Sequence, residues 1–251
     1  MNPSIRSALA MSCFALLGVS SATLAAAPAT SALVNAAVAD SARPEADRVR
    51  DVDRKPAEVI QLTGIHQGAK IAEMLPGGGY FTRIFSKLVG ANGVVYAWVP
   101  PAAGGRDAGA AVRTLAADKN YPNIKVVNLD ATPLPEKVDF VWTSLNYHDM
   151  HNRPNADLTA QNKQVWDALK PGGLYVLIDH AAESGSGARD SSTLHRIDPE
   201  LVKKEVTSVG FKLVQDSKLL ASPADDRKKP SREIERGKTD QFFFIFQKPA
   251  T

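Results

Sequence analysis

Residues 69–90 read AKIAEMLPGGGYFTRIFSKLVG, and this stretch decides the fold. An apolar run ending at Glu73 leads into Pro-Gly-Gly-Gly and then into residues 80–89, whose apolar side chains recur at helical spacing. Glycines let the chain turn tightly and let a ligand approach the bare backbone, and the following helix directs free N–H groups at that place. A strand, a glycine turn and a helix in this order predict the ligand-binding corner of a doubly wound α/β sheet.

The rest of the chain continues this alternation of apolar runs and helical patterns. Strands are expected at 70–75, 93–99, 124–128, 138–144, 174–179, 211–220 and 241–247. Helices are expected within 47–64 and at 80–89, 108–118, 158–169 and 199–210, with a chain turn at 171–173. The order predicts an α/β fold: a doubly wound, mostly parallel seven-stranded sheet with helices on both faces and an antiparallel C-terminal strand pair.

Composition narrows the class of protein. The chain has 251 residues, of which 44% are hydrophobic and 23% charged, as in one globular domain. Its formal charge is only +3, and no basic stripe interleaves with aromatic residues, so we expect no nucleic-acid partner. We also expect no membrane span in the mature chain, because the N-terminal apolar run is too short and no later run is comparable.

The N-terminus is typical of an export signal. Arg6 precedes an uncharged apolar run and a group of small residues, so residues 1–27 are interpreted as a signal peptide, and the protein is predicted to be periplasmic or secreted. A misassigned start codon is the alternative. Cys13, the only cysteine, lies in this segment, so the mature chain would hold no thiol chemistry. Residues 28–45, rich in alanine and serine, are interpreted as a linker before a single domain at 46–251.

Four segments together resemble the class I (Rossmann-like) S-adenosylmethionine-dependent methyltransferases. They are EMLPGGGY, NLDATPLPEKVDFVW, LKPGGLYVLID, and the closing pair GFKLV and DQFFFIFQK, and they cover about residues 50–248. The first segment resembles a variant of the family motif with Pro-Gly-Gly-Gly and an aromatic residue. A dinucleotide fingerprint would need a glycine where Thr82 stands, which argues against NAD. The resemblance implies a methyltransferase-like domain, S-adenosylmethionine as cofactor and a small-molecule methyl acceptor.

The resemblance also implies which residues bind the cofactor. They are Glu73, Pro76, Gly77, Gly78, Gly79, Tyr80, Trp98, Asp130, Ala131 and Asn146. Asp130 matches the acid that accepts from the adenine amino group, although an Asp before Pro133 could instead cap a turn. Leu75 stands where the family motif usually has its first glycine. A second position departs from the family with more consequence: Val99 stands where an acid usually holds the ribose hydroxyls. This departure keeps open an exported non-catalytic or altered ligand-binding protein on the same fold.

Catalytic candidates follow the fourth strand, at the sheet edge where ligands of such folds bind. His148 is the first choice as a base, because the pKa of histidine lies near neutrality, or it anchors the loop. Asp149 would orient His148 or cap the next segment, and Tyr147 would form a wall of the acceptor pocket.

Two further interpretations use the same loops. His148, Asp149, His151 and His180 resemble a loose set of metal ligands, but without regular helical spacing. We therefore predict no metal and keep a metal-dependent enzyme as an alternative. Arg189 and Arg196 could clamp an anionic acceptor or pair with Asp190 and Asp198.

Overall fold

A single sheet of seven strands organises the protein. The computed structural model describes Met1 and residues 31–102, 107–129 and 133–250. The strands are β1 (Lys70–Met74), β2 (Val94–Val99), β3 (Ile124–Asn128), β4 (Val138–Ser144), β5 (Leu169–His180), β6 (Lys212–Ser217) and β7 (Gln241–Gln247). Their order is β3-β2-β1-β4-β5-β7-β6. The strands from β3 to β5 pair in parallel, and β7 lies antiparallel between β5 and β6. The predicted fold class is confirmed.

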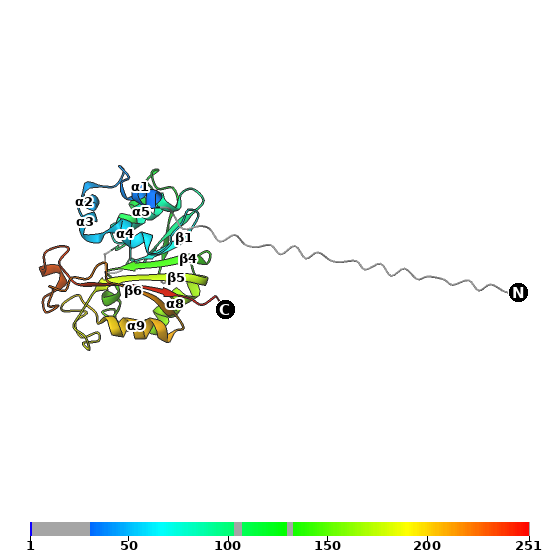
Figure 1. Cartoon of the computed structure of the whole chain (residues 1–251). Coiled ribbons are helices and arrows are strands. Elements are labelled where there is room, and N and C mark those ends of the chain that lie inside the picture. Colours follow the sequence, from blue (N-terminus) through cyan, green and yellow to red (C-terminus); the bar gives the residue numbers. More distant parts are fainter. Residues whose placement is uncertain (2–30, 103–106, 130–132, 251) are drawn as a thin grey trace.

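Helices cover both faces of this sheet (Figure 1). One face carries α1 (Ser31–Val38), α4 (Pro56–Gln61), α5 (Tyr80–Val89) and α6 (Ala110–Ala116), and the other carries α8 (Leu158–Ala168) and α9 (Pro199–Ser208). Each face has its own apolar core, with Trp142 fully buried in one and Trp98 in the other. Because both faces are covered, every residue of β2 is buried, as a continuous apolar run predicts.

Short helices frame the edge where the parallel strands end. They are α2 (Glu45–Arg48), α3 (Asp51–Arg54), α7 (Tyr147–Met150) and the 3-10 helix η1 (Ser231–Glu233). Two of the longer helices, α8 and α9, begin at side-chain caps: Asp157 accepts from the backbone of Ala160, and Asp198 caps α9 ahead of Pro199. Within the described parts of the chain, no helix has the length and apolar character to cross a membrane.

Three expectations differ from the structure. From Ser31 onward the expected linker contains α1, whose Val34 is fully buried against the core, while residues 28–30 and the expected signal at 2–27 lie outside the described residues. Residues 47–64 form three short helices, because Lys55 has a left-handed φ of 44° and Pro56 starts α4 anew. Residues 171–173 do not end a strand; they form an irregularity inside β5, opposite a register shift in β4.

Candidate functional site

The glycine corner, Gly77 to Gly79, joins β1 to α5 at the carboxyl edge of the sheet. Gly77 and Gly79 have left-handed φ angles of 55° and 82°. A Cβ on Gly79 would lie 2.6 Å from Cδ2 of Leu115, so this glycine is needed for packing. A Cβ on Gly77 or Gly78 would meet no described heavy atom within 4 Å. The backbone at these two positions is therefore open to a ligand.

Glu73 and Tyr80 flank this corner and are both buried. The Glu73 carboxylate accepts a hydrogen bond of 2.6 Å from Oγ1 of Thr82 on α5. Burial raises the pKa of Glu73 to about 8, against the hydrogen bond and two nearby arginines. The Tyr80 hydroxyl donates to Oδ1 of Asp51 at 2.6 Å. Both side chains therefore form hydrogen bonds within the protein, and these contacts hold the residues that flank the glycine corner in place.

Asn146 ties the end of β4 to the end of β1. Its Nδ2 donates to the carbonyl oxygens of Leu75, at 3.2 Å, and Ser144, at 2.8 Å. Leu75 and Leu145 both have left-handed φ angles, 55° and 61°, which leucine rarely adopts. Such backbone strain concentrates at functional sites. Asp130 and Ala131, the other loop residues implied by the resemblance, lie outside the described residues.

Trp98 and Val99 end β2 and point to opposite faces. Trp98 is fully buried on the α8 face, where it lines a cavity of about 660 Å³ together with Leu129 and Met150. Its Nε1 has no hydrogen-bond partner among the described residues. Val99 is buried under α6, where the Cβ of an alanine at Gly109 would come within 2.9 Å of it. The side chain at the position that carries an acid in the resembled family thus offers no hydrogen-bond acceptor here.

His148 is held at the start of α7 by a partner on the neighbouring strand. Asp179, at the end of β5, accepts from the backbone N–H of His148 through Oδ2 and faces its ring Nδ1 through Oδ1, both at 2.8 Å. Burial by itself would lower the pKa of His148, but Asp179 and then Asp149 raise it above its ordinary value. The orienting carboxylate is therefore Asp179, whereas Asp149 lies 3.4 Å from Nε2.

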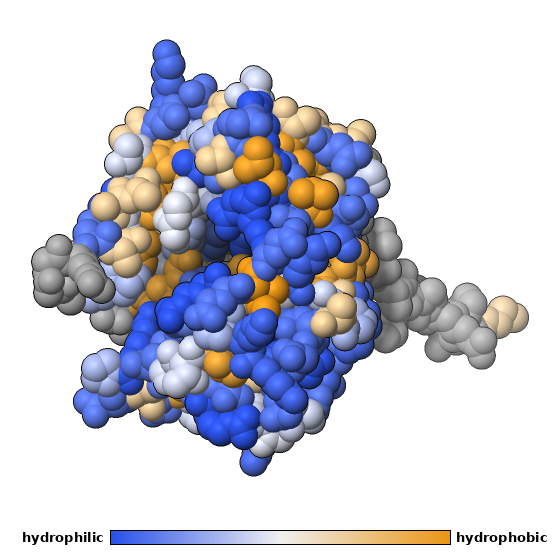
Figure 2. All heavy atoms as spheres, turned by 90° about the vertical axis from the view of Figure 1, so that its left-hand side faces the viewer, coloured by the Kyte–Doolittle hydropathy of each residue, from blue (hydrophilic) through white to orange (hydrophobic). Residues whose placement is uncertain are grey.

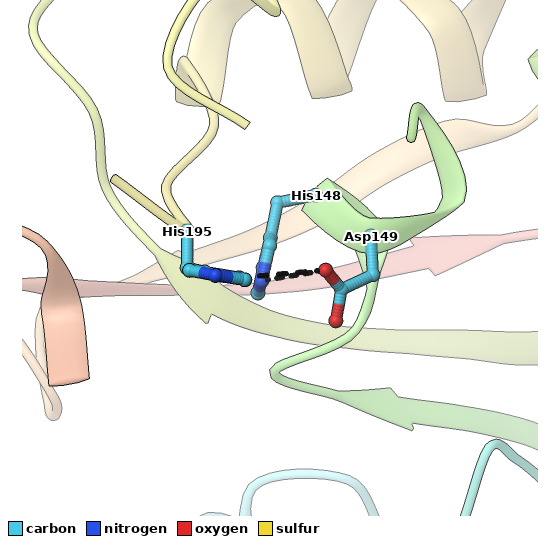
Figure 3. A group of neighbouring side chains, drawn as sticks. All are labelled: His148, Asp149 and His195. Carbon is cyan, nitrogen blue, oxygen red and sulfur yellow. Dashed lines mark ion pairs between the residues drawn. The ribbon is translucent and has the colours of Figure 1, made fainter. Parts of the chain in front are cut away.

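His195 completes a small cluster with His148 and Asp149 (Figure 3). Nδ1 of His195 lies 3.5 Å from Oδ1 of Asp149, and one potential ligand atom of each of the three residues lies within 4.8 Å of the others. Imidazole and carboxylate groups suit zinc or iron. The cluster differs from the metal set considered in the sequence, because His195 joins it while His151 faces Glu205 at 3.2 Å. Arg232 approaches Nε2 of His195 at 3.3 Å.

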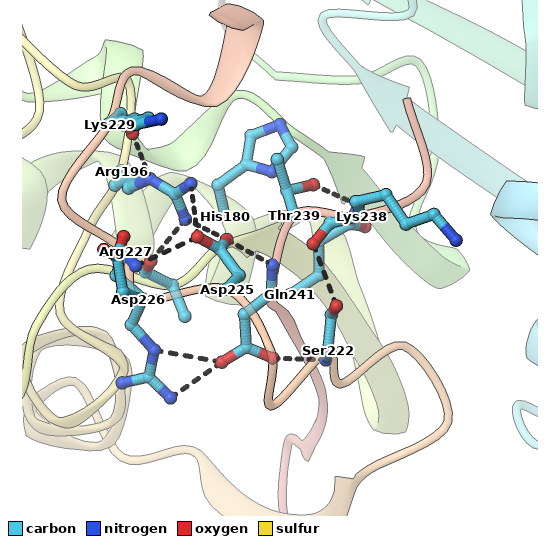
Figure 4. A network of polar contacts seen from close by, with 12 residues as sticks. His180, Arg196, Ser222, Asp225, Asp226, Arg227, Lys229, Lys238, Thr239 and Gln241 are labelled. Atoms are coloured by element: carbon cyan, nitrogen blue, oxygen red, sulfur yellow. Dashed lines mark hydrogen bonds and ion pairs between the residues drawn. The ribbon is translucent and has the colours of Figure 1, made fainter. Parts of the chain in front are cut away.

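The remaining candidates have structural partners. Tyr147 is fully buried, and its hydroxyl lies between Glu205, at 2.8 Å, and Asn162, at 2.9 Å. Arg189 pairs with Asp190 at 3.0 Å, as one alternative predicted. Arg196 is fully buried and pairs with Asp225 at 2.8 Å rather than with Asp198 (Figure 4). Neither arginine is available to clamp an acceptor.

A cavity of about 250 Å³ lies where β4 and β5 end, and apart from His180 its lining residues were not singled out in the sequence. Arg50 and Arg54 reach it from the N-terminal helices, and Arg232 and Arg236 reach it from the loop before β7. Leu145 and His180 lie at the strand ends beneath. Figure 2 views this edge of the molecule, where a hollow has mainly polar residues on its right and lower sides and more apolar residues on its left.

Comparisons with known proteins identify the fold. No family model and no curated protein matches the chain. Among solved structures, an S-adenosylmethionine-dependent methyltransferase from Aquifex aeolicus matches with a TM-score of 0.58 and 16% identity, over 81% of this chain and 95% of that one. The [4+2]-cyclase SpnF matches with a TM-score of 0.55 and 14% identity, over 90% of this chain and 98% of that one. The fold is thus that of S-adenosylmethionine-dependent methyltransferases, and it also occurs in a protein named for another reaction.

Proposed function

We propose that this chain is an S-adenosylmethionine-dependent methyltransferase that acts on a small-molecule acceptor. The observation that carries the proposal is the open backbone of Gly77 and Gly78 ahead of α5, at the carboxyl edge of a methyltransferase-like sheet. S-adenosylmethionine, when bound, supplies an electrophilic methyl group on a sulfonium. The fold alone would not suffice, because one scaffold carries many activities.

The residues around the corner fit such a cofactor in part. The cofactor would contact the exposed backbone of Gly77 and Gly78 and the loop that Asn146 links to Leu75. Asp130 and Ala131 remain predicted contacts. Val99 does not fit, because an unpaired hydroxyl in a dry site costs about 1–3 kcal/mol. We therefore expect micromolar rather than tighter binding.

His148 would serve the acceptor. Because Asp179 faces Nδ1, the ring nitrogen left to receive a proton is Nε2, which has Asp149 beside it at 3.4 Å. Nε2 can take the proton that a hydroxyl, thiol or ammonium acceptor loses. Methyl transfer from a sulfonium needs little acid–base help, so holding the acceptor in place would supply most of the rate. His148 then adds to the rate chiefly with acceptors that must be deprotonated.

Isothermal titration calorimetry with S-adenosylmethionine and S-adenosylhomocysteine tests the cofactor. We expect micromolar dissociation constants, and we expect the Gly78→Trp variant to lose binding while keeping its melting temperature, since its side chain would enter open space. Absence of both heat and a thermal shift with either ligand would contradict the proposal.

A second candidate is an altered ligand-binding protein on the same fold. Val99 favours it, and so does the likeness to a protein named for a cyclisation. Mass spectrometry of small molecules released from the native protein on denaturation separates the two: a ligand without an adenosine group would favour this candidate.

A third candidate, a metal-dependent enzyme, draws support from the cluster of His148, Asp149 and His195. Elemental analysis of protein purified without chelators would reveal a stoichiometric metal. We expect none, because Arg232 already approaches His195 and would place a positive charge beside the ion.

Export is the last part of the proposal, and it depends on the signal-like residues 1–27. Cell fractionation with N-terminal sequencing of the mature protein tests it. Recovery of the uncleaved chain from the cytoplasm would contradict export and leave the proposed chemistry untouched.

A further inference from the structure

We propose that the cavity at the ends of β4 and β5 binds a small anion, and that the methyl acceptor therefore carries a carboxylate. The part of this inference that concerns the methyl acceptor rests on the proposed function. The anion site itself can be tested without any methyl transfer. The cavity is smaller than the roughly 300–1,000 Å³ of sites for drug-sized ligands, so its occupant is small.

The charge around the cavity is strongly unbalanced. Four arginines line it, and Asp53 is the one acid among the lining residues. Asp53 is already engaged, because its Oδ2 lies 3.2 Å from Nε of Arg236. Among the residues that the structure describes, no carboxylate forms an ion pair with Arg50, Arg54 or Arg232. Three positive charges thus face the cavity without an anionic partner.

Arg50 and Arg54, which line the cavity from the N-terminal helices, are held in place by contacts with uncharged groups. Arg54 stacks over the ring of Tyr80 at 4.4 Å and donates to Oγ of Ser144 at 3.0 Å. Arg50 lies over the same ring at 5.1 Å. Burial is the main cause that lowers the pKa of Arg54 to about 10; repulsion from the charge of Arg50 lowers it further, while Glu73 and Asp47 act in the opposite direction. A bound carboxylate would relieve that repulsion, and the guanidinium fork matches its two oxygens.

His180, Thr239 and Gln241 add polar contacts to the cavity lining without further positive charge. Burial lowers the pKa of His180 to about 4, so its ring is neutral at physiological pH. Nδ1 of His180 is buried and has no hydrogen-bond partner within the described parts of the chain. Thr239 and Gln241 lie beside it, and the charge of Arg196 behind it is balanced by Asp225 (Figure 4). These three residues suit the polar part of a ligand whose anionic end meets the arginines.

The cavity is close to the proposed base. The ring centroids of His180 and His148 are 6.3 Å apart, and Arg232 contacts His195, whose ring lies 5.4 Å from that of His148. A molecule anchored by its carboxylate at the arginines would therefore extend along the edge that His148 faces.

Fluorine NMR titration of the full chain with 4-fluorobenzoate and its neutral isostere 4-fluorobenzamide tests the anion site. We expect the carboxylate to bind on the order of ten-fold more tightly than the amide, and its affinity to fall as salt is raised. Arg50→Gln and Arg232→Gln should each weaken the carboxylate on the order of ten-fold and leave the amide unchanged. Arg48→Gln is the matched control, because Arg48 pairs with Glu45 at 2.8 Å outside the cavity lining. Equal affinity for the two probes, no binding of the carboxylate, or equal effects of all three variants would overturn the proposal.

A carboxylate could also come from the cofactor itself, so a second titration uses protein saturated with S-adenosylhomocysteine. Retained binding of 4-fluorobenzoate assigns the arginines to the acceptor. Loss of its binding would assign them to the cofactor and overturn the inference about the acceptor. If the protein binds no S-adenosylhomocysteine but still prefers the carboxylate, the proposed function fails while the anion site stands.

Discussion

Asp179 meets His148 twice, once at the backbone N–H and once at the ring Nδ1, with both distances at 2.8 Å. Asp179, at the end of β5, thereby fixes both the position and the tautomer of the His148 side chain, which follows the neighbouring strand β4. Histidines that act in catalysis are commonly oriented in this way through their second nitrogen.

The Asp179→Asn variant should lower the pKa of His148, because the charge of Asp179 is the main influence that raises it. Titration of the histidine ring protons by NMR measures this. Asp149→Asn serves as the comparison: Asp149 is exposed and 3.4 Å from Nε2, so its removal should lower the pKa less. If both variants leave the titration where it is in the native protein, Asp179 does not control the charge of this ring.

The His148→Ala variant should slow methyl transfer about 100-fold or more with an acceptor that must lose a proton. Since protonated His148 cannot act as a base and its pKa is raised, native activity should increase with pH through a pKa above 6.5, and the variant should lack this step. Steady-state rates of the native protein and the variant, measured at pH values below and above this pKa, test the prediction. Full turnover by the variant would leave His148 as a loop anchor only.

The Glu73→Gln variant should change how stability depends on pH. The folded-state pKa of Glu73 is about 8 and its ordinary value is 4.5, so between these values the folded chain keeps a proton that the unfolded chain releases. Native stability should therefore be present in full below pH 4.5 and be lost as the pH rises toward 8, by at most ~1.4 kcal/mol per pH unit. Urea unfolding of both proteins at several pH values tests this; parallel curves for the two would show that Glu73 does not keep its proton on folding.

Alanine at the glycine corner should act differently at neighbouring positions. Gly79→Ala should cost about 1–3 kcal/mol of stability, because φ is 82° and the new Cβ would lie 2.6 Å from Leu115. Gly78→Ala should be nearly neutral, since its Cβ meets no described atom within 4 Å. Thermal unfolding of the pair reports the difference, and equal losses would show that the corner is packed shut.

The bounds of helices and strands were predicted best where the local sequence alone determines the conformation of the element. Residues 80–89, 124–128 and 241–247 have the predicted bounds, because a strong apolar pattern and flanking glycine or polar residues specify them locally. Residues 171–173 were wrongly expected to turn, because Pro-Gly-Gly reads as a turn unless the neighbouring strand supplies the opposite register shift.

The candidate site was harder to predict because its parts converge from distant segments. His148 follows one predicted strand and Asp179 ends another, but their pairing depends on which strands are neighbours. Arg50 and Arg54 lie in a charged stretch of sequence, where nothing distinguishes them as binding residues. Their contacts with the ring of Tyr80 place them at the cavity. Arg196 drew attention instead, although Asp225 neutralises it.

Leu75 and Leu145 hold left-handed backbone at adjacent strand ends, linked by the side chain of Asn146. Each such residue costs roughly 1–2 kcal/mol, which the packed domain must offset. The packing around the two turns, rather than the local preference of leucine, therefore determines their conformation. We therefore expect a ligand that binds against Leu75 and Leu145 to lose little free energy in ordering these two turns.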